Sequence, residues 1–231
     1  MAKFSRVEVI NETLRIGVVP VFYHPDLEVA KKVVQACARA GLRLIEFTNR
    51  GDNAWRIFSD LVLHFTSADP GVILGAGSVV EAGTGALYIS SGANFVVGPV
   101  LNAELARVCN SHKVSYSPGC GSASEISQAE ELGVKIVKIL PGDAVGGPKF
   151  VKSVLAPMPW TRIKPTGGVD STQESIEAWF KAGVAAVGIG SNLVRADCVA
   201  AGEFDKITEL GRQLIDWARL ARSKSQPGGM Q

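Results

Sequence analysis

The 231-residue sequence predicts an α/β fold, a single (β/α)8 barrel, and three observations support this prediction. Eight short apolar runs recur along the chain, amphipathic segments separate them, and glycines mark many of the junctions. The runs are almost uninterrupted, as expected for parallel strands covered on both faces. The expected strands are residues 17–23, 42–48, 72–77, 95–99, 114–118, 134–140, 162–166 and 185–190. A doubly wound open sheet is the alternative, since eight β–α units also fit that architecture.

One expected helix shows its start and stop signals clearly. It covers residues 26–40, begins at Asp26 after Pro25, and ends before Gly41, the residue type that most often closes a helix. The same pattern predicts three further helices, at residues 102–111, 122–132 and 172–182. An additional helix is expected before the first strand, around residues 6–14, and a flexible tail over residues 223–231. No linker interrupts the pattern, so residues 1–231 are expected to form one domain.

Composition argues against several functional classes. Hydrophobic residues make up 46% of the chain and charged residues 20%, which is enough for a core and unlike a disordered protein. The formal net charge is +2 and basic residues form no stripe, so nucleic-acid and membrane-surface partners are not expected. No apolar stretch is long enough to span a membrane, and the N-terminus lacks the apolar core of a signal peptide.

Cysteine and histidine usage indicates a metal-free protein of the cytoplasm. The four cysteines, Cys37, Cys109, Cys120 and Cys198, lack CxxC spacing and are expected to be free thiols in a reducing compartment. The three histidines are far apart in the sequence and form no ligand pair. We therefore expect neither a metal nor another cofactor.

Lys138 is the most informative residue, because it lies inside the apolar run 134–140. A charge on a strand buried on both faces is costly unless it is paired or neutralised. A lysine pushed toward neutrality is a nucleophile that can form a Schiff base with a carbonyl substrate. The alternative is a lysine whose head reaches solvent at the strand end. Lys164, late in the run 162–166, is an equal candidate on these grounds, and residue chemistry alone does not choose between the two.

Two further charged residues are expected near this lysine. Glu46 and Arg50 share one face of the second expected strand with Leu42, because side chains along a strand alternate with period two. Both fall toward the carboxyl end of the strand, as Lys138 does in its own, and barrel active sites are built there. Glu46 suits a general acid/base, and the planar guanidinium of Arg50 suits a carboxylate. The alternatives are a structural Glu46–Lys138 ion pair and a solvated arginine.

Glycine-rich turns follow the last two expected strands. Residues 165–168 read Pro-Thr-Gly-Gly, and residues 188–191 read Gly-Ile-Gly-Ser. Adjacent glycines let backbone N–H groups approach an anion, and the corresponding loops of barrels commonly bind phosphate. These turns are candidate phosphate sites, with Ser191 adding a hydroxyl; tight turns without a ligand are the alternative. Small residues at 75–77 leave room for a ligand, and Ser78 offers it a hydroxyl or an N–H group.

These residues together resemble the 2-keto-3-deoxy-6-phosphogluconate (KDPG) aldolase / 4-hydroxy-2-oxoglutarate (KHG) aldolase family of class I aldolases, over about residues 16–220. Most of the matching pieces are weak individually, but their order and spacing together are specific. The pieces are residues 19–21 (VPV), 45–50 (IEFTNR), 75–79 (GAGSV), 98–99 (GP), 117–119 (SPG), 137–141 (VKILP), 165–168 (PTGG) and 190–191 (GS).

The resemblance implies specific roles. Lys138 would be the Schiff-base lysine, Glu46 the general acid/base and Arg50 the ligand of the substrate carboxylate, whereas the family position of Lys164 is not catalytic. Ser78 would lie near the pyruvyl moiety, and Thr166, Gly167, Gly168 and Ser191 around a distal phosphate. The substrate-binding positions implied in this way are Arg50, Ser78, Pro99, Thr166, Gly167, Gly168, Gly190 and Ser191.

The reaction expected from the resemblance is reversible cleavage of KDPG to pyruvate and glyceraldehyde 3-phosphate, by a metal-free homotrimer that binds small 2-keto acids. Cleavage of 4-hydroxy-2-oxoglutarate or of a phosphogalactonate isomer is the alternative within the class, and a barrel that binds a phosphorylated ligand without turnover is the alternative outside it. The chain departs from the usual family pattern around Lys138, at Asp143 in place of glutamate, and at Asn49 in place of leucine. These departures bear on the substrate pocket more than on the reaction.

Overall fold

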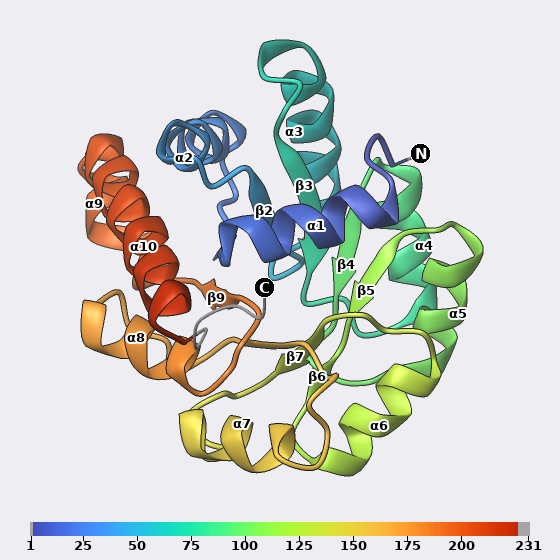
Figure 1. The fold of residues 1–231 in the computed structure, drawn as a ribbon. Coiled ribbons are helices and arrows are strands. Elements are labelled where there is room, and N and C mark those ends of the chain that lie inside the picture. The colour runs from blue at the N-terminus through green and yellow to red at the C-terminus, as the bar shows by residue number, and fades with distance from the viewer. Residues whose placement is uncertain (1, 226–231) are drawn as a thin grey trace.

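Parallel strands curl into a barrel in this computed structural model, which describes residues 2–225 (Figure 1). Within those residues, nine strand segments fill eight positions around the barrel. They are β1 (Val18–Phe22), β2 (Leu44–Thr48), β3 (Ile73–Gly77), β4 (Phe95–Val97), β5 (Ser115–Ser117), β6 (Gly119–Cys120), β7 (Val137–Ile139), β8 (Ile163–Pro165) and β9 (Val187–Ile189). Every strand pairing is parallel, which confirms the predicted α/β barrel.

The hydrogen-bonded order is β5-β4-β3-β2-β1-β9 in one sheet and β6-β7-β8 in the other. Pro118, which has no N–H group to donate, separates β5 from β6, so these two segments share one position of the barrel. At the second junction, a parallel bridge joins Thr166 to Gly188, and the N–H of Ala185 donates to the carbonyl of Ile163. The ring is therefore closed, which excludes the doubly wound open sheet.

Helices surround the ring and cover its outer face, and the first of them lies across an end of it (Figure 1). They are α1 (Arg6–Ile16), α2 (Leu27–Ala40), α3 (Ala54–Ala68), α4 (Ala82–Ser90), α5 (Ala103–Ser111), α6 (Ala123–Glu131), α7 (Gly147–Leu155), α8 (Gln173–Lys181), α9 (Ala196–Ala200) and α10 (Phe204–Ser225). The predicted signals form real caps: Asp26 accepts a hydrogen bond from the N–H of Val29, and Gly41 has φ 95° at the end of α2. The four predicted helices between the strands correspond to α2, α5, α6 and α8.

Helix α1 closes one end of the barrel, as Figure 1 shows where it lies across the ring. Ser5 and Glu8 form a capping box at its start. Its Val9 is buried in a cluster of inward-facing residues contributed by strands β1 to β4. That cluster consists of Val9, Val19, Leu44, Ile73, Phe95 and Val97. Because β2, β3 and β4 begin at three of these residues, α1 covers the amino-terminal end, and the carboxyl end is left for a site.

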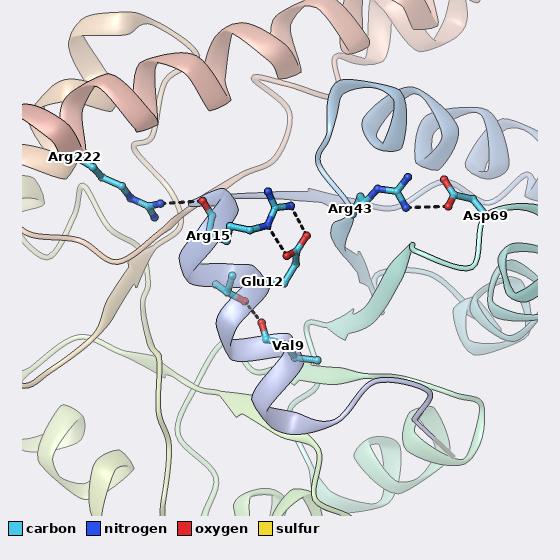
Figure 2. A network of polar contacts seen from close by, with 7 residues as sticks. Val9, Glu12, Arg15, Arg43, Asp69 and Arg222 are labelled. Carbon is cyan, nitrogen blue, oxygen red and sulfur yellow. Dashed lines mark hydrogen bonds and ion pairs between the residues drawn. The ribbon is translucent and has the colours of Figure 1, made fainter.

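Polar contacts hold α1 in this position (Figure 2). Arg222 of α10 donates to the backbone carbonyls of Leu14, at 2.6 Å, and Arg15, at 3.2 Å, and also to the carbonyl of Ala185. Within α1, Glu12 pairs with Arg15 at 2.6 Å. The last helix therefore ties the amino-terminal helix to the strand that closes the ring.

Several predicted boundaries differ from the structure by one to three residues. Strand β2 begins at Leu44, so Leu42 lies outside it and packs among the helices instead of sharing the face of Glu46. Strand β7 is limited to residues 137–139 of the predicted 134–140, because the preceding residues form a bend. The predicted tail starts at residue 223, yet α10 continues to Ser225; the rest of that tail lies outside the described residues. No helix in residues 2–225 is long and apolar enough to cross a membrane.

Candidate active site

Glu46 lies in the middle of β2 and is completely buried inside the barrel. It pairs in register with Gly75 of β3 on one side and Val21 of β1 on the other. A Cβ atom on Gly77 would collide with the Glu46 carboxylate, so this glycine gives the carboxylate its space. The small residues at 75–77, predicted to leave room for a ligand, therefore also leave room for an acidic side chain.

Two lysines face this carboxylate from the opposite side of the ring. Lys138 in β7 and Lys164 in β8 are paired in register, so their side chains leave the wall on the same face. Lys138 Nζ lies 3.7 Å from Oε1 of Glu46, and Lys164 Nζ lies 3.7 Å from Oε2. Their side chains are 6% and 4% exposed. At this separation the contacts are ion pairs and not hydrogen bonds.

The carboxylate has few other contacts. Neither oxygen of Glu46 has a hydrogen-bond donor among residues 2–225. Burial lowers the pKa of Lys164 from its usual 10.5 to about 8; the charge of Glu46 opposes this shift, and the charge of Lys138 adds to it. A buried amine that loses its proton near neutral pH can act as a nucleophile or a proton carrier.

The structure brings Glu46 and Lys138 together, and it adds Lys164 as an equal neighbour. The sequence already marked Lys164 as a rival nucleophile, because it is a charge late in an apolar strand. Its contact with Glu46 was not predicted. Ser117 in β5 was also missed: it is buried, pairs in register with the inward-facing Val97, and its hydroxyl has no partner among the described residues. Ser117 belongs to the SPG piece that resembles the family, but no local pattern assigned a role to its hydroxyl.

The two glycine-rich turns lie side by side at the carboxyl end. Thr166 forms a bridge with Gly188, and a Cβ atom on that glycine would contact the Thr166 hydroxyl. This hydroxyl is buried and has no partner within residues 2–225. Gly167 and Gly168 have φ values of 87° and 68°, which favour glycine. Gly190 directly follows β9.

Asn192 joins these two turns to each other. Its Nδ2 donates to the carbonyl of Val169 at 3.1 Å and to the Asp170 carboxylate at 3.0 Å. Ser191, immediately before it, is exposed. The side chain of Asn192 therefore sets the spacing of the two turns, a role that the sequence did not indicate.

The remaining predicted ligands lie in the loops at the same end. Arg50 follows β2, is exposed, and pairs with no carboxylate in the described part of the chain. Ser78 follows β3 in the left-handed conformation, with φ 57°. Pro99 follows β4, is half-buried, and its carbonyl lies against Gly119. The structure brings these residues to the same end of the barrel as Glu46 and Lys138, at the rim and not in its interior.

Asn49, one of the departures from the family pattern, is hydrogen-bonded to a buried tyrosine. Asn49 accepts a hydrogen bond from the hydroxyl of Tyr88 at 2.9 Å, and Tyr88 is fully buried between α4 and the barrel. Asp143 is exposed; its carboxylate accepts a hydrogen bond from the N–H of Ala144, and its backbone carbonyl accepts one from the N–H of Gly146. The four cysteines are free, as predicted. No cluster of three or more potential metal ligands occurs in the part of the chain described.

Comparisons with known proteins agree with this architecture. The chain is 32% identical to the KHG/KDPG aldolase of Escherichia coli K12 over 203 residues, 88% of this chain and 92% of the relative. It superposes on a Legionella pneumophila KDPG aldolase, whose crystal structure holds pyruvate as a covalent carbinolamine, with a TM-score of 0.81 and 26% identity, covering 89% of this chain and 97% of the other.

A second solved structure is similar over the same region. The KDPG aldolase of Zymomonas mobilis ZM4, determined with 3-phosphoglycerate, superposes with a TM-score of 0.79 at 28% identity, covering 92% of this chain and 97% of that one. Residues 9–210 match the sequence family described as KDPG and KHG aldolase. The match covers most of the barrel, and it includes the strands that carry Glu46 and Lys138. The chain therefore belongs to the KDPG and KHG aldolase family, as a class I aldolase.

Proposed function

We propose that this aldolase cleaves KDPG reversibly to pyruvate and glyceraldehyde 3-phosphate, through a Schiff base on Lys138. The observation that carries the proposal is the buried contact of 3.7 Å between Lys138 Nζ and Glu46 Oε1 at the heart of the barrel. An amine held beside a carboxylate, away from water, has a proton donor and acceptor in place for imine chemistry. The carbinolamine of pyruvate in the Legionella relative supports the same type of intermediate.

The reaction begins at the C2 carbonyl of the substrate. The neutral amine of Lys138 forms a bond to C2, the electron pair of the C=O bond moves to oxygen, and the oxygen takes up a proton. The nitrogen passes one of its own protons to Glu46, so a neutral carbinolamine results. Glu46 then delivers a proton to that hydroxyl, which leaves as water, and an iminium ion forms. The positive nitrogen accepts the electron pair of the C3–C4 bond when a base removes the C4 hydroxyl proton. The aldehyde departs, C3 of the enamine is protonated, and water releases pyruvate from Lys138.

The rim residues would hold the two ends of the substrate. Arg50, which is free of other carboxylates in the described chain, would bind the substrate carboxylate, with Ser78 and Pro99 beside the pyruvyl carbons. The turns that contain Thr166, Gly167, Gly168, Gly190 and Ser191 would bind the phosphate through backbone N–H groups and hydroxyls. The 3-phosphoglycerate in the Zymomonas relative supports a phosphate site in this fold. The homotrimer and the cytoplasmic location stay predictions.

Borohydride reduction in the presence of pyruvate tests the nucleophile directly. Borohydride reduces an imine to a stable amine, so the modified lysine can be identified by peptide mass mapping. We expect a reduced pyruvyl group on Lys138 in the wild-type protein and none on the whole chain of Lys138→Ala. The exposed Lys135, three residues earlier, is the matched control, and Lys135→Met should still be labelled at Lys138. An adduct on another lysine, or none, would contradict the proposal.

The second candidate substrate is 4-hydroxy-2-oxoglutarate, because the E. coli relative is named for both compounds. The two differ at the end far from the keto acid, where KDPG carries a phosphate ester and 4-hydroxy-2-oxoglutarate a carboxylate, so the turns around Thr166 and Gly190 should matter more for KDPG. We expect kcat/KM to be higher for KDPG than for 4-hydroxy-2-oxoglutarate. An equal or reversed ratio would assign the chain to the unphosphorylated substrate, and a preference for the phosphogalactonate isomer would assign it to that compound.

A further inference from the structure

Glu46 is shared by two lysines, and this is more positive charge than one carboxylate can neutralise. Lys138 faces Oε1 and Lys164 faces Oε2, each at 3.7 Å, and all three side chains are buried. A second buried cation is expensive, and a barrel interior accepts such a group mainly where it has a task. The proposed aldol reaction uses Lys138 and Glu46 but leaves Lys164 unassigned.

The surroundings of Lys164 contain few other charges. Glu46 from β2 and Lys138 from β7 are the charged groups that act on it. The neighbouring β9 contributes Val187, Gly188 and Ile189, none of which titrates. Lys164 therefore interacts with the same carboxylate that the Schiff-base lysine needs.

We propose that Lys164 is a positioning residue of the aldol reaction, whose ammonium group holds Oε2 of Glu46 so that Oε1 stays directed at Lys138 through the reaction cycle. The proposal rests on Lys138 being the nucleophile. Lys138 attacks as a neutral amine and is still neutral in the carbinolamine, so at these stages it does not attract the carboxylate as an ammonium ion does. The oxygens of Glu46 have no hydrogen-bond donor within residues 2–225, so Lys164 is the remaining cation that keeps them in place.

The charge state of Lys164 predicts how the activity should change with pH. Burial lowers the pKa of Lys164 to about 8, so the ammonium group is lost as the pH rises through that value. A lysine that must stay charged makes activity fall above about pH 8, whereas a lysine that acts as the free amine makes it rise over the same range. The two roles therefore predict opposite pH dependences.

Exchange of the pyruvate methyl protons with deuterated solvent isolates the relevant steps. Exchange requires the iminium ion on the lysine and a group that removes and returns a C3 proton, and it needs no aldehyde substrate. Its rate can be followed by proton NMR between about pH 6 and pH 10, and kcat and KM for pyruvate can be separated. The variants are Lys164→Met and Lys164→Arg, with Lys135→Met as the control on an exposed lysine of the neighbouring segment.

The expected results distinguish positioning from a structural role. Lys164→Met should still be labelled on Lys138 by pyruvate and borohydride, but its kcat should fall about a hundredfold, with KM changed by less than about threefold. The fall in rate above about pH 8 should disappear with it. Lys164→Arg, which stays charged, should recover part of kcat and move the alkaline fall out of the measured range. Lys135→Met should match the wild type.

Each contrary result overturns the proposal in a recognisable way. An unchanged kcat and pH profile in Lys164→Met would leave Lys164 without any role in the reaction. A pyruvyl adduct on Lys164 in the wild type would make it the nucleophile, and an absent adduct would overturn the Schiff-base function as well. If Lys164→Met does not fold, the wild-type profile and Lys164→Arg decide, because an alkaline fall that stays in place in Lys164→Arg contradicts the proposal.

Discussion

Replacing Lys164 by methionine should make the protein more stable at neutral pH, although it removes an ion pair. Burial moves the pKa of Lys164 from 10.5 to about 8, and each pH unit is worth about 1.4 kcal/mol, so its ammonium form destabilises the fold by about 3 kcal/mol. Methionine has a similar length and no charge to bury. Glu46 keeps Lys138 as its counterion in the variant, so no uncompensated charge is left behind.

The direction in which stability changes with pH follows from proton binding. Between about pH 8 and 10.5 the unfolded chain holds a proton on Lys164 that the folded protein has lost, so wild-type stability rises with pH in this window as far as this group is concerned. The advantage of Lys164→Met should therefore be full below about pH 8 and should vanish toward pH 10.5. Lys135→Met, at an exposed position, should change stability by less than about 0.5 kcal/mol at both pH values.

Urea unfolding at pH 7 and at about pH 10 measures both quantities. We expect the unfolding free energy of Lys164→Met to exceed that of the wild type by about 3 kcal/mol at pH 7 and by much less at pH 10. A variant that is less stable than the wild type at pH 7 would refute the reasoning. It would mean that attraction to Glu46 outweighs the burial of the second cation.

Three further predictions concern the site and the hydrogen bonds that Arg222 makes to α1 and Ala185. Gly77→Ala should lower kcat about a hundredfold, because the new methyl group displaces the Glu46 carboxylate. Gly121→Ala should leave kcat unchanged, because a methyl group at that position makes only ordinary van der Waals contacts. Thr166→Val should raise KM for KDPG about tenfold without loss of stability, since its buried hydroxyl has no protein partner; Thr161→Val, a similar hydroxyl before β8, should leave KM unchanged. Arg222→Met removes three hydrogen bonds to backbone carbonyls and should lower the unfolding free energy, measured in urea, by about 2 kcal/mol. An unchanged unfolding free energy would show that these hydrogen bonds do not stabilise the fold.

Local sequence signals accounted for the secondary structure well. The caps at Asp26 and Gly41 depend on residues within a few positions of each other, and uninterrupted apolar runs reflect strands buried on both faces. Boundaries were less accurate where longer-range contacts decide them. Leu42 matches the period-two pattern of β2, yet it packs among the helices, because the strand starts only where its neighbour β3 offers hydrogen bonds.

Alternation along single strands was enough to predict that Glu46 and Lys138 share one site, since side chains of inward parity converge inside a barrel. It could not show how many lysines the carboxylate would meet. That depends on the register of β7 against β8, which puts Lys138 and Lys164 at the same level, and on Gly77 leaving space for the carboxylate between them. Lys138 and Lys164 belong to segments far apart in the chain, so their register is not visible in either segment alone.

Periodicity, charges in apolar strands and the order of short motifs were enough to predict the barrel, the aldolase family and the candidate residues Glu46, Lys138 and Lys164. The tertiary structure alone decided that Lys164 shares Glu46 with Lys138, and that Asn192 joins the two glycine-rich turns. The physical reason is distance along the chain: each of these contacts joins residues that only the closed ring brings together. Burial inside that ring, which no local pattern measures, then lowers the pKa of Lys164 to about 8.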